Sequence, residues 1–126
     1  VSGNHIAVDG TAVYVGGSFE GTVDFDPGPG ERLLTTPVNQ QNEFVAAYDA
    51  TTGAFLWAFK LSPTSVVAFP DFLDVNDLTA DGTSVYLTGD FRGPADFDPS
   101  VGETVLDGGP NSGAYVAAYD ATTGAL

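Results

Sequence analysis

An internal repeat is the feature of this chain that most restricts its fold. Residues 9–19 (DGTAVYVGGSF) return 72 positions later as residues 81–91 (DGTSVYLTGDF). From Asp9 to Glu31, 14 of 23 positions are identical in the second copy. Residues 45–54 then return unchanged as residues 116–125, 71 positions later. A chain of this kind builds one supersecondary unit more than once and buries its apolar faces by stacking the units.

The repeat divides the 126 residues into two units. Unit 1 spans residues 1–72, and unit 2 spans residues 73–126. Val1 aligns with Leu73, and Leu126 aligns with Phe55, so unit 2 is incomplete and has no counterpart of the last strand of unit 1. Because both ends fall within a repeat, we expect the chain to be a window on a longer tandem array.

Strand signals dominate each unit. The chain has 16 glycines and 8 prolines, and no stretch of a dozen residues shows the apolar spacing of a helix. Alternating β-branched and aromatic residues, bounded by Asp-Gly and similar turns, predict strands. The predicted strands are residues 6–8, 12–19, 44–48 and 55–61 in unit 1 and residues 78–80 and 85–87 in unit 2. The turn at residues 49–53 predicts a hairpin between the last two strands of unit 1, with Asp opening it and Gly53 closing it.

These strands predict an all-β fold of tandem four-stranded antiparallel β-propeller-like blades. A β-sandwich is the alternative. The period of about 72 exceeds the 40 to 50 residues of common propeller repeats. The excess is about the length of the insertion at residues 21–43, which carries Pro27, Pro29 and Pro37 and is expected to form a loop on one face.

Four motifs follow one another in unit 1: Ile-Ala-Val-Asp-Gly, Val-Tyr-Val-Gly-Gly-Ser-Phe, Val-Asp-Phe-Asp-Pro-Gly and Phe-Val-Ala-Ala-Tyr-Asp-Ala-Thr-Thr-Gly, with Leu-Trp-Ala after them. In this order they resemble the bacterial β-propeller repeats of the SBBP type. The resemblance covers essentially the whole chain. It implies a large secreted or cell-surface bacterial protein in which the blades serve as scaffold or adhesion modules, and it implies no fixed catalytic residues.

Charge restricts the partners of the chain. Seventeen acidic residues against three basic ones give a formal net charge of −14, which repels both nucleic acid and an anionic membrane surface. No stretch approaches the roughly 20 apolar residues of a membrane span. The absence of cysteine excludes disulfides, thiol catalysis and cysteine-bound zinc. The expected partners are other copies of the same repeat or chain, or a glycan or surface protein.

An acidic loop occurs once in each unit and is the best candidate for chemistry. Alternation along Val-Asp-Phe-Asp places its first two carboxylates on one face, and a third follows a glycine-containing stretch. Calcium prefers six to eight oxygen ligands, which such a loop could supply, although the spacing is not that of an EF-hand. The candidate calcium ligands are Asp24, Asp26 and Glu31 in unit 1 and Asp96, Asp98 and Glu103 in unit 2.

A plain turn is the other interpretation of this loop. Asp caps a turn, Pro fixes φ and Gly reverses the chain, and Phe25 and Phe97 could recur simply as apolar plugs. A second acidic group, formed by Asp71, Asp74 and Asp77, has no counterpart in unit 1 and is expected to be a solvated loop.

Catalytic motifs are missing from the sequence. His5 is the only histidine and has no recognisable nucleophile or acid partner in the sequence, and no carboxyl group is singled out as having a raised pKa. Phe55, Trp57 and Phe59 alternate on one face of a strand, where they form core between units or, alternatively, a sugar-stacking platform. Tyr48 and Tyr119 are expected to bury their rings near hairpin ends with the hydroxyl groups at the rim.

The sequence thus predicts a non-catalytic structural module. We expect an extracellular scaffold repeat of a bacterial surface or secreted protein that self-associates or forms part of a longer array or filament. The alternative is a calcium-dependent module that binds a glycan or a protein.

Overall fold

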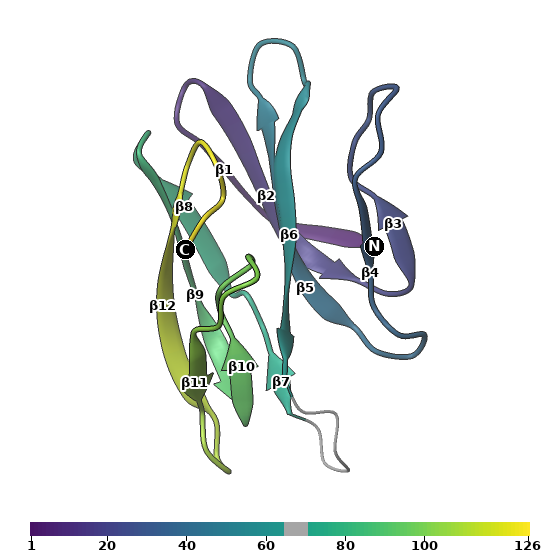
Figure 1. The fold of residues 1–126 in the computed structure, drawn as a ribbon. Helices are drawn as coiled ribbons and strands as arrows, with labels where there is room; N and C mark the ends of the chain where they lie inside the picture. The colour runs from purple at the N-terminus through teal and green to yellow at the C-terminus, as the bar shows by residue number, and fades with distance from the viewer. Residues whose placement is uncertain (65–70) are drawn as a thin grey trace.

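The structure, a computed structural model, describes residues 1–64 and 71–126 (Figure 1). These two segments contain strands and turns and no helix, so no helix in them could span a membrane. Every strand pair among the described residues is antiparallel. The all-β prediction is therefore confirmed, while two facing antiparallel sheets also suit the sandwich alternative.

Unit 1 forms four adjacent strands in chain order. They are β1 (Ser2–Val8), β2 (Ala12–Phe19), β5 (Asn42–Asp49) and β6 (Phe55–Pro63). The β1–β2 turn is fastened by Asp9, whose carboxylate accepts the backbone N–H of Thr11 and Ala12 at 2.9 and 3.0 Å. The same carboxylate accepts the hydroxyl of Tyr14 at 2.6 Å. The β1–β2 and β5–β6 hairpins lie where the local turn signals predict them.

Unit 2 builds its sheet around one long strand. β9 (Ser84–Arg92) pairs with β12 (Gly113–Asp120) on one side and with β8 (Asp77–Ala80) and the short β7 (Phe72–Leu73) on the other. Among the described residues β12 lies at the edge of this sheet.

The insertion is a hairpin in both units, so the prediction of a plain loop is wrong. In unit 1 it contains β3 (Thr22–Asp24) and β4 (Leu33–Thr35), which form a two-stranded sheet. In unit 2 it contains β10 (Pro94–Asp96) and β11 (Val105–Asp107), and β10 also pairs with β6 of unit 1. That pairing extends the sheet of unit 1 to the six-stranded order β1-β2-β5-β6-β10-β11.

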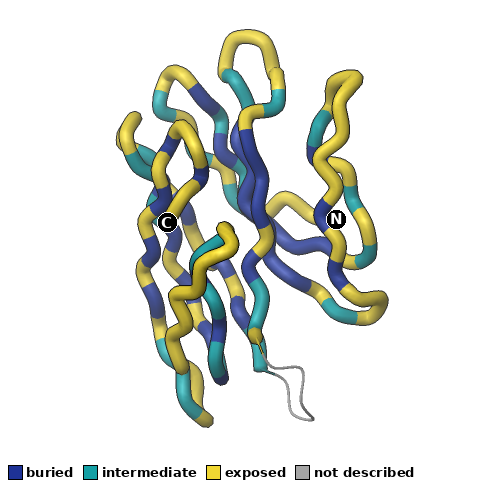
Figure 2. The backbone as a smooth tube through the Cα atoms, in the orientation of Figure 1, coloured by how far each residue is buried: buried dark blue, intermediate teal, exposed yellow. Residues whose placement is uncertain are grey.

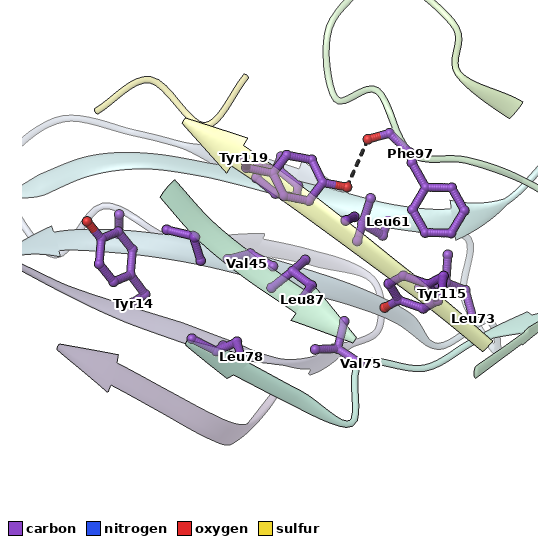
Figure 3. Close-up of a cluster of buried hydrophobic side chains, with 14 of the residues drawn as sticks. Tyr14, Val45, Leu61, Leu73, Val75, Leu78, Leu87, Phe97, Tyr115 and Tyr119 are labelled. Carbon is purple, nitrogen blue, oxygen red and sulfur yellow. Dashed lines mark hydrogen bonds between the residues drawn. The ribbon is translucent and has the colours of Figure 1, made fainter. Parts of the chain in front are cut away.

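Among the described residues, two apolar clusters fill the interior. The larger lies between the sheets of the two units and includes Tyr14, Val45, Leu87 and Tyr119 (Figure 3). The smaller lies between the sheet of unit 1 and its own hairpin β3–β4 and includes Phe25. Both faces of β5 are therefore covered, and Figure 2 shows the buried residues concentrated on the central strands of unit 1. The principal core is thus the contact between the two repeats.

Candidate functional site: the contact between the repeats

Strand β6 belongs to both units at once. Along one edge it pairs with β5, from Glu43 opposite Leu61 to Tyr48 opposite Phe55. Beyond this stretch, Ser62 and Pro63 lie opposite two residues of β10 in unit 2. β6 therefore completes the sheet of one repeat and receives the hairpin of the next.

Trp57 joins the two units through its ring and its N–H group. The indole is 8% exposed and stacks on Phe59 at a centroid separation of 5.5 Å and an angle of 9°. Its Nε1 donates a hydrogen bond to the carbonyl oxygen of Ala121 at 3.1 Å. Gly124 lies against the indole with a φ of +73°, and a Cβ there would lie 2.9 Å from the ring. The last turn of unit 2 is thus shaped around an aromatic side chain of unit 1.

Tyr119 extends this contact into unit 2. Its ring centroid lies 4.7 Å from that of Phe59. Its hydroxyl donates to the carbonyl oxygen of Phe97 at 2.9 Å (Figure 3). The side chain is 1% exposed, so the prediction of a hydroxyl at the rim is wrong for Tyr119: the hydroxyl lies inside, where it anchors the acidic loop. Tyr48 makes the same bond to Phe25 in unit 1, also at 2.9 Å.

The predicted aromatic row is only partly correct. Trp57 and Phe59 belong to the cluster between the units, whereas Phe55 packs against the smaller cluster of unit 1. The register of β5 and β6 shifts between Ala47 and Tyr48. A bulge of this kind breaks the alternation of side chains, and for this reason Phe55 points to the other face.

The acidic loops are held by their own first carboxylates. Asp24 accepts the backbone N–H groups of Asp26 at 3.0 Å and Arg32 at 2.9 Å. In unit 2, Asp96 accepts those of Asp98 at 3.0 Å and Thr104 at 2.9 Å. The backbone bonds from Arg32 and Asp26 lower the pKa of Asp24. These carboxylates close the loop, which is the role that the turn interpretation gives them.

The other candidate ligands lie on or near the surface. Asp26 accepts the N–H of Gly28 at 2.8 Å, and Asp98 accepts that of Ser100 at 2.8 Å. Glu31 and Glu103 are exposed. Within residues 1–64 and 71–126, no three His, Asp or Glu side chains are grouped as a metal site would require. The hydrogen bonds of Asp24 and Asp96 are those that the turn interpretation predicts, and the calcium interpretation stays a prediction.

We expect the melting temperature to be the same in saturating calcium and in excess chelator, because the first carboxylate of each loop is already hydrogen-bonded. A ligand that binds only the folded state would raise the melting temperature with its concentration. Thermal unfolding followed by circular dichroism makes the comparison, with magnesium as the control for ionic strength. A rise specific to calcium would establish the loops as calcium sites.

Glu43 is a residue that the motif search missed. It is 7% exposed, in β5. Burial and, next, repulsion from Asp74 raise its pKa from 4.5 to about 7, although the backbone N–H of Val75 donates to it. A local signal was present: alternation places Glu43 on the same face as Val45 and Ala47, which are core residues.

Carboxylates of both units meet around Glu43. Burial and then repulsion from Asp90 raise the pKa of Asp74. Asp90 accepts the side-chain amide of Asn76 at 3.0 Å, and the hydroxyl of Tyr115 donates to the backbone carbonyl of Asp74 at 3.1 Å. The predicted solvated loop is therefore correct only in part: Asp74 and Asp77 are exposed and Asp71 is half-buried, but Asp74 also acts on a buried glutamate across the contact.

Comparison with models of known families, with curated proteins and with solved structures finds no match to this chain.

Proposed function

We propose that this chain is a non-catalytic structural module whose units stack as blade-like repeats in a tandem array. The observation that carries the proposal is that β6 pairs with β5 in its own unit and with β10 in the following one. A strand shared in this way makes each unit depend on its neighbour, as repeat scaffolds do.

The faces used by the two units support an array that continues in one direction. In unit 1 the side chains that face unit 2 include Val45 and Ala47. In unit 2 the side chains that face unit 1 include Tyr115 and Ala117, which correspond to Phe44 and Ala46 in the repeat. Opposite faces of equivalent strands therefore meet. A twofold-symmetric pair would use the same face twice, whereas successive blades use opposite faces.

The setting of the module is proposed to be a bacterial surface or secreted protein. The net charge of −14 and the resemblance to SBBP-type repeats support this setting. The pKa of Glu43 is raised, but its side chain lies buried between the units, where it suits a structural contact better than catalysis. The calcium-dependent adhesion alternative depends on the twin acidic loops, and the comparison of calcium with chelator tests it.

An added repeat tests the array directly. In the register of the repeat, residues 56–126 can be appended once more after Leu126, because Leu126 aligns with Phe55. We expect the longer protein to unfold in one cooperative transition, with a higher melting temperature and a urea m-value about 1.5 times that of the original chain.

The matched control appends the same residues in scrambled order. If the added native residues unfold in a separate transition, or remain unfolded like the scrambled ones, the units do not propagate and the scaffold proposal is wrong.

A further inference from the structure

The outer edge of β12 differs from the same edge of its repeat counterpart. β5 pairs with β2 on one side and with β6 on the other. β12 pairs with β9, and within the described parts of the chain its other edge carries no strand. Unpaired N–H and C=O groups along such an edge are a template for one more strand.

Identical sequences on the two strands differ in burial. The segment Val-Ala-Ala-Tyr occurs in β5 and again in β12. Val45 is 0% exposed, whereas its counterpart Val116 is 77% exposed. Ala47 is likewise buried, and its counterpart Ala118 is exposed. In unit 1 these two residues lie opposite Phe59 and Trp57 of β6, and they also face the sheet of unit 2, so the exposed pair lacks both an adjoining strand and a facing sheet.

The insertion hairpins of the two units also differ in burial, and again the side chains of unit 2 are the more exposed. Leu34 in β4 is 9% exposed and packs in a cluster with Ala58 of β6. Its counterpart Leu106 in β11 is 46% exposed, and the neighbouring Val105 is 47% exposed. A strand of the β6 type beside β12 would supply the small apolar residue that Leu34 contacts in unit 1.

Charge also complements such a strand. In unit 1 the ammonium group of Lys60 in β6 donates to the carbonyl oxygen of Thr35 at 2.8 Å. The residue that corresponds to Thr35 in unit 2 is Asp107, which is exposed. A lysine that occupies the position of Lys60 in a strand on β12 would therefore lie near the carboxylate of Asp107. The net charge of −14 also favours a strand that carries a positive charge.

A shallow hollow lies on the face of the unit 2 sheet that carries Val116. It has a volume of about 220 Å³ and is lined mainly by residues of β8 and β9, among them Thr79, Tyr86 and Thr88, with Val116 from β12. Tyr86 is the repeat counterpart of Tyr14. Tyr14 is 1% exposed, and the centroid of its ring lies 6.0 Å from that of Trp57. Tyr86, which lies opposite Ala118, thus offers an indole of an incoming strand the neighbour that Trp57 has in unit 1.

We propose that the free edge of β12 binds an extended peptide strand of the β6 type, with the pattern Phe-x-Trp-Ala-Phe-Lys-Leu. The strand adds antiparallel to β12, in the register that β6 has on β5, with its second Phe opposite Val116 and its Trp opposite Ala118. This is β-augmentation, in which main-chain hydrogen bonds provide affinity and alternate side chains provide specificity. The inference rests on the proposed function, since it names the element that would join unit 2 to a following unit.

A synthetic peptide of residues 55–63 tests this directly against the intact chain. We expect the peptide to slow hydrogen exchange at the β12 amides that point away from β9, and to shift their NMR signals, while those of β5 and β10 stay unchanged. A peptide of the same composition in scrambled order is the control and should do neither.

Two surface variants localise the site. Val116→Lys places a charge where the second Phe of the peptide packs, and we expect it to weaken peptide binding at least about tenfold. Val101→Lys is the matched control, because Val101 is fully exposed and lies in the acidic loop, and it should bind as the original chain does.

Several outcomes would overturn the proposal. Among them are equal binding of the scrambled peptide, equal binding by the Val116→Lys variant, and protection that appears at β5 or β10 through displacement of the resident β6. Dimerisation of the chain through β12 in the absence of peptide would assign the edge to a second copy instead. If the peptide fails but the chain with an added repeat unfolds as one unit, the strand proposal falls and the scaffold proposal stands.

Discussion

Replacing Trp57 by alanine is expected to lower the free energy of unfolding by about 3–5 kcal/mol, the usual range for removing a buried Trp. The indole packs on Phe59 and against the turn at Gly124, and its N–H satisfies the carbonyl oxygen of Ala121. Its loss would open a void between the units and leave that carbonyl without its partner. Urea unfolding followed by circular dichroism measures the change. Leu56→Ala is the control, because Leu56 is 44% exposed in the same strand and should lose much less.

A pair of glycine variants separates the Trp57 contact from backbone strain. Gly53 and Gly124 are repeat counterparts, and both have a φ of +73°. A Cβ at Gly124 would lie 2.9 Å from the indole, whereas a Cβ at Gly53 would meet nothing within 4 Å. Alanine should therefore strain the backbone equally at both positions but disturb the contact between units only at Gly124. Equal losses of stability in the two variants would show that the contact contributes little.

Between about pH 4.5 and pH 7, the free energy of unfolding of the original chain is expected to fall as the pH rises, and the Glu43→Gln variant is expected not to show this fall. In the folded chain the pKa of Glu43 is raised from 4.5 to about 7, so the unfolded state ionises first. The contribution of Glu43 to the free energy of unfolding is therefore fully present below pH 4.5. It is lost as the pH rises from there through 7. A shift of this size corresponds to about 3 kcal/mol.

Glutamine keeps the oxygen that accepts the N–H of Val75 and has no charge to repel Asp74. The measurement is the free energy of unfolding at pH 5 and pH 8 for both proteins. Glu103→Gln serves as the control, because Glu103 is exposed and should leave the slope with pH unchanged. A variant with the same pH dependence as the original chain would show that Glu43 ionises without cost in the folded state.

Local signals predicted six of the twelve strands in the described residues, because the alternation and the turn residues that define those six lie within a few positions of one another. β2 spans the predicted residues 12–19, and the hairpin turn at residues 49–53 is present. The insertion hairpins escaped prediction because their strands are three residues long and lie among prolines and glycines. Such short strands are defined by their partners rather than by their own sequence.

The site between the repeats depends on distant partners, which a single sequence does not pair. The bond from Trp57 to Ala121 spans 64 positions, and the bulge that turns Phe55 to the other face depends on the register of β5. Glu43 was hidden for another reason: its counterpart in the repeat is Ala114, so a search for recurring motifs passes over it. Its place among core residues on one face of a strand was the signal that could have revealed it.

The sharing of β6 gives the molecule a direction. The strand pairing, the Trp57 hydrogen bond and the Phe59–Tyr119 ring contact all run from the last strand of one unit to the hairpin, the final turn and the tyrosine face of the next. An array built on this contact is polar, with one end that presents an acceptor face and another that presents a strand edge. The two ends then require different caps, and subunits added to such an array would join at each end through different chemistry, as at the two ends of a polar filament.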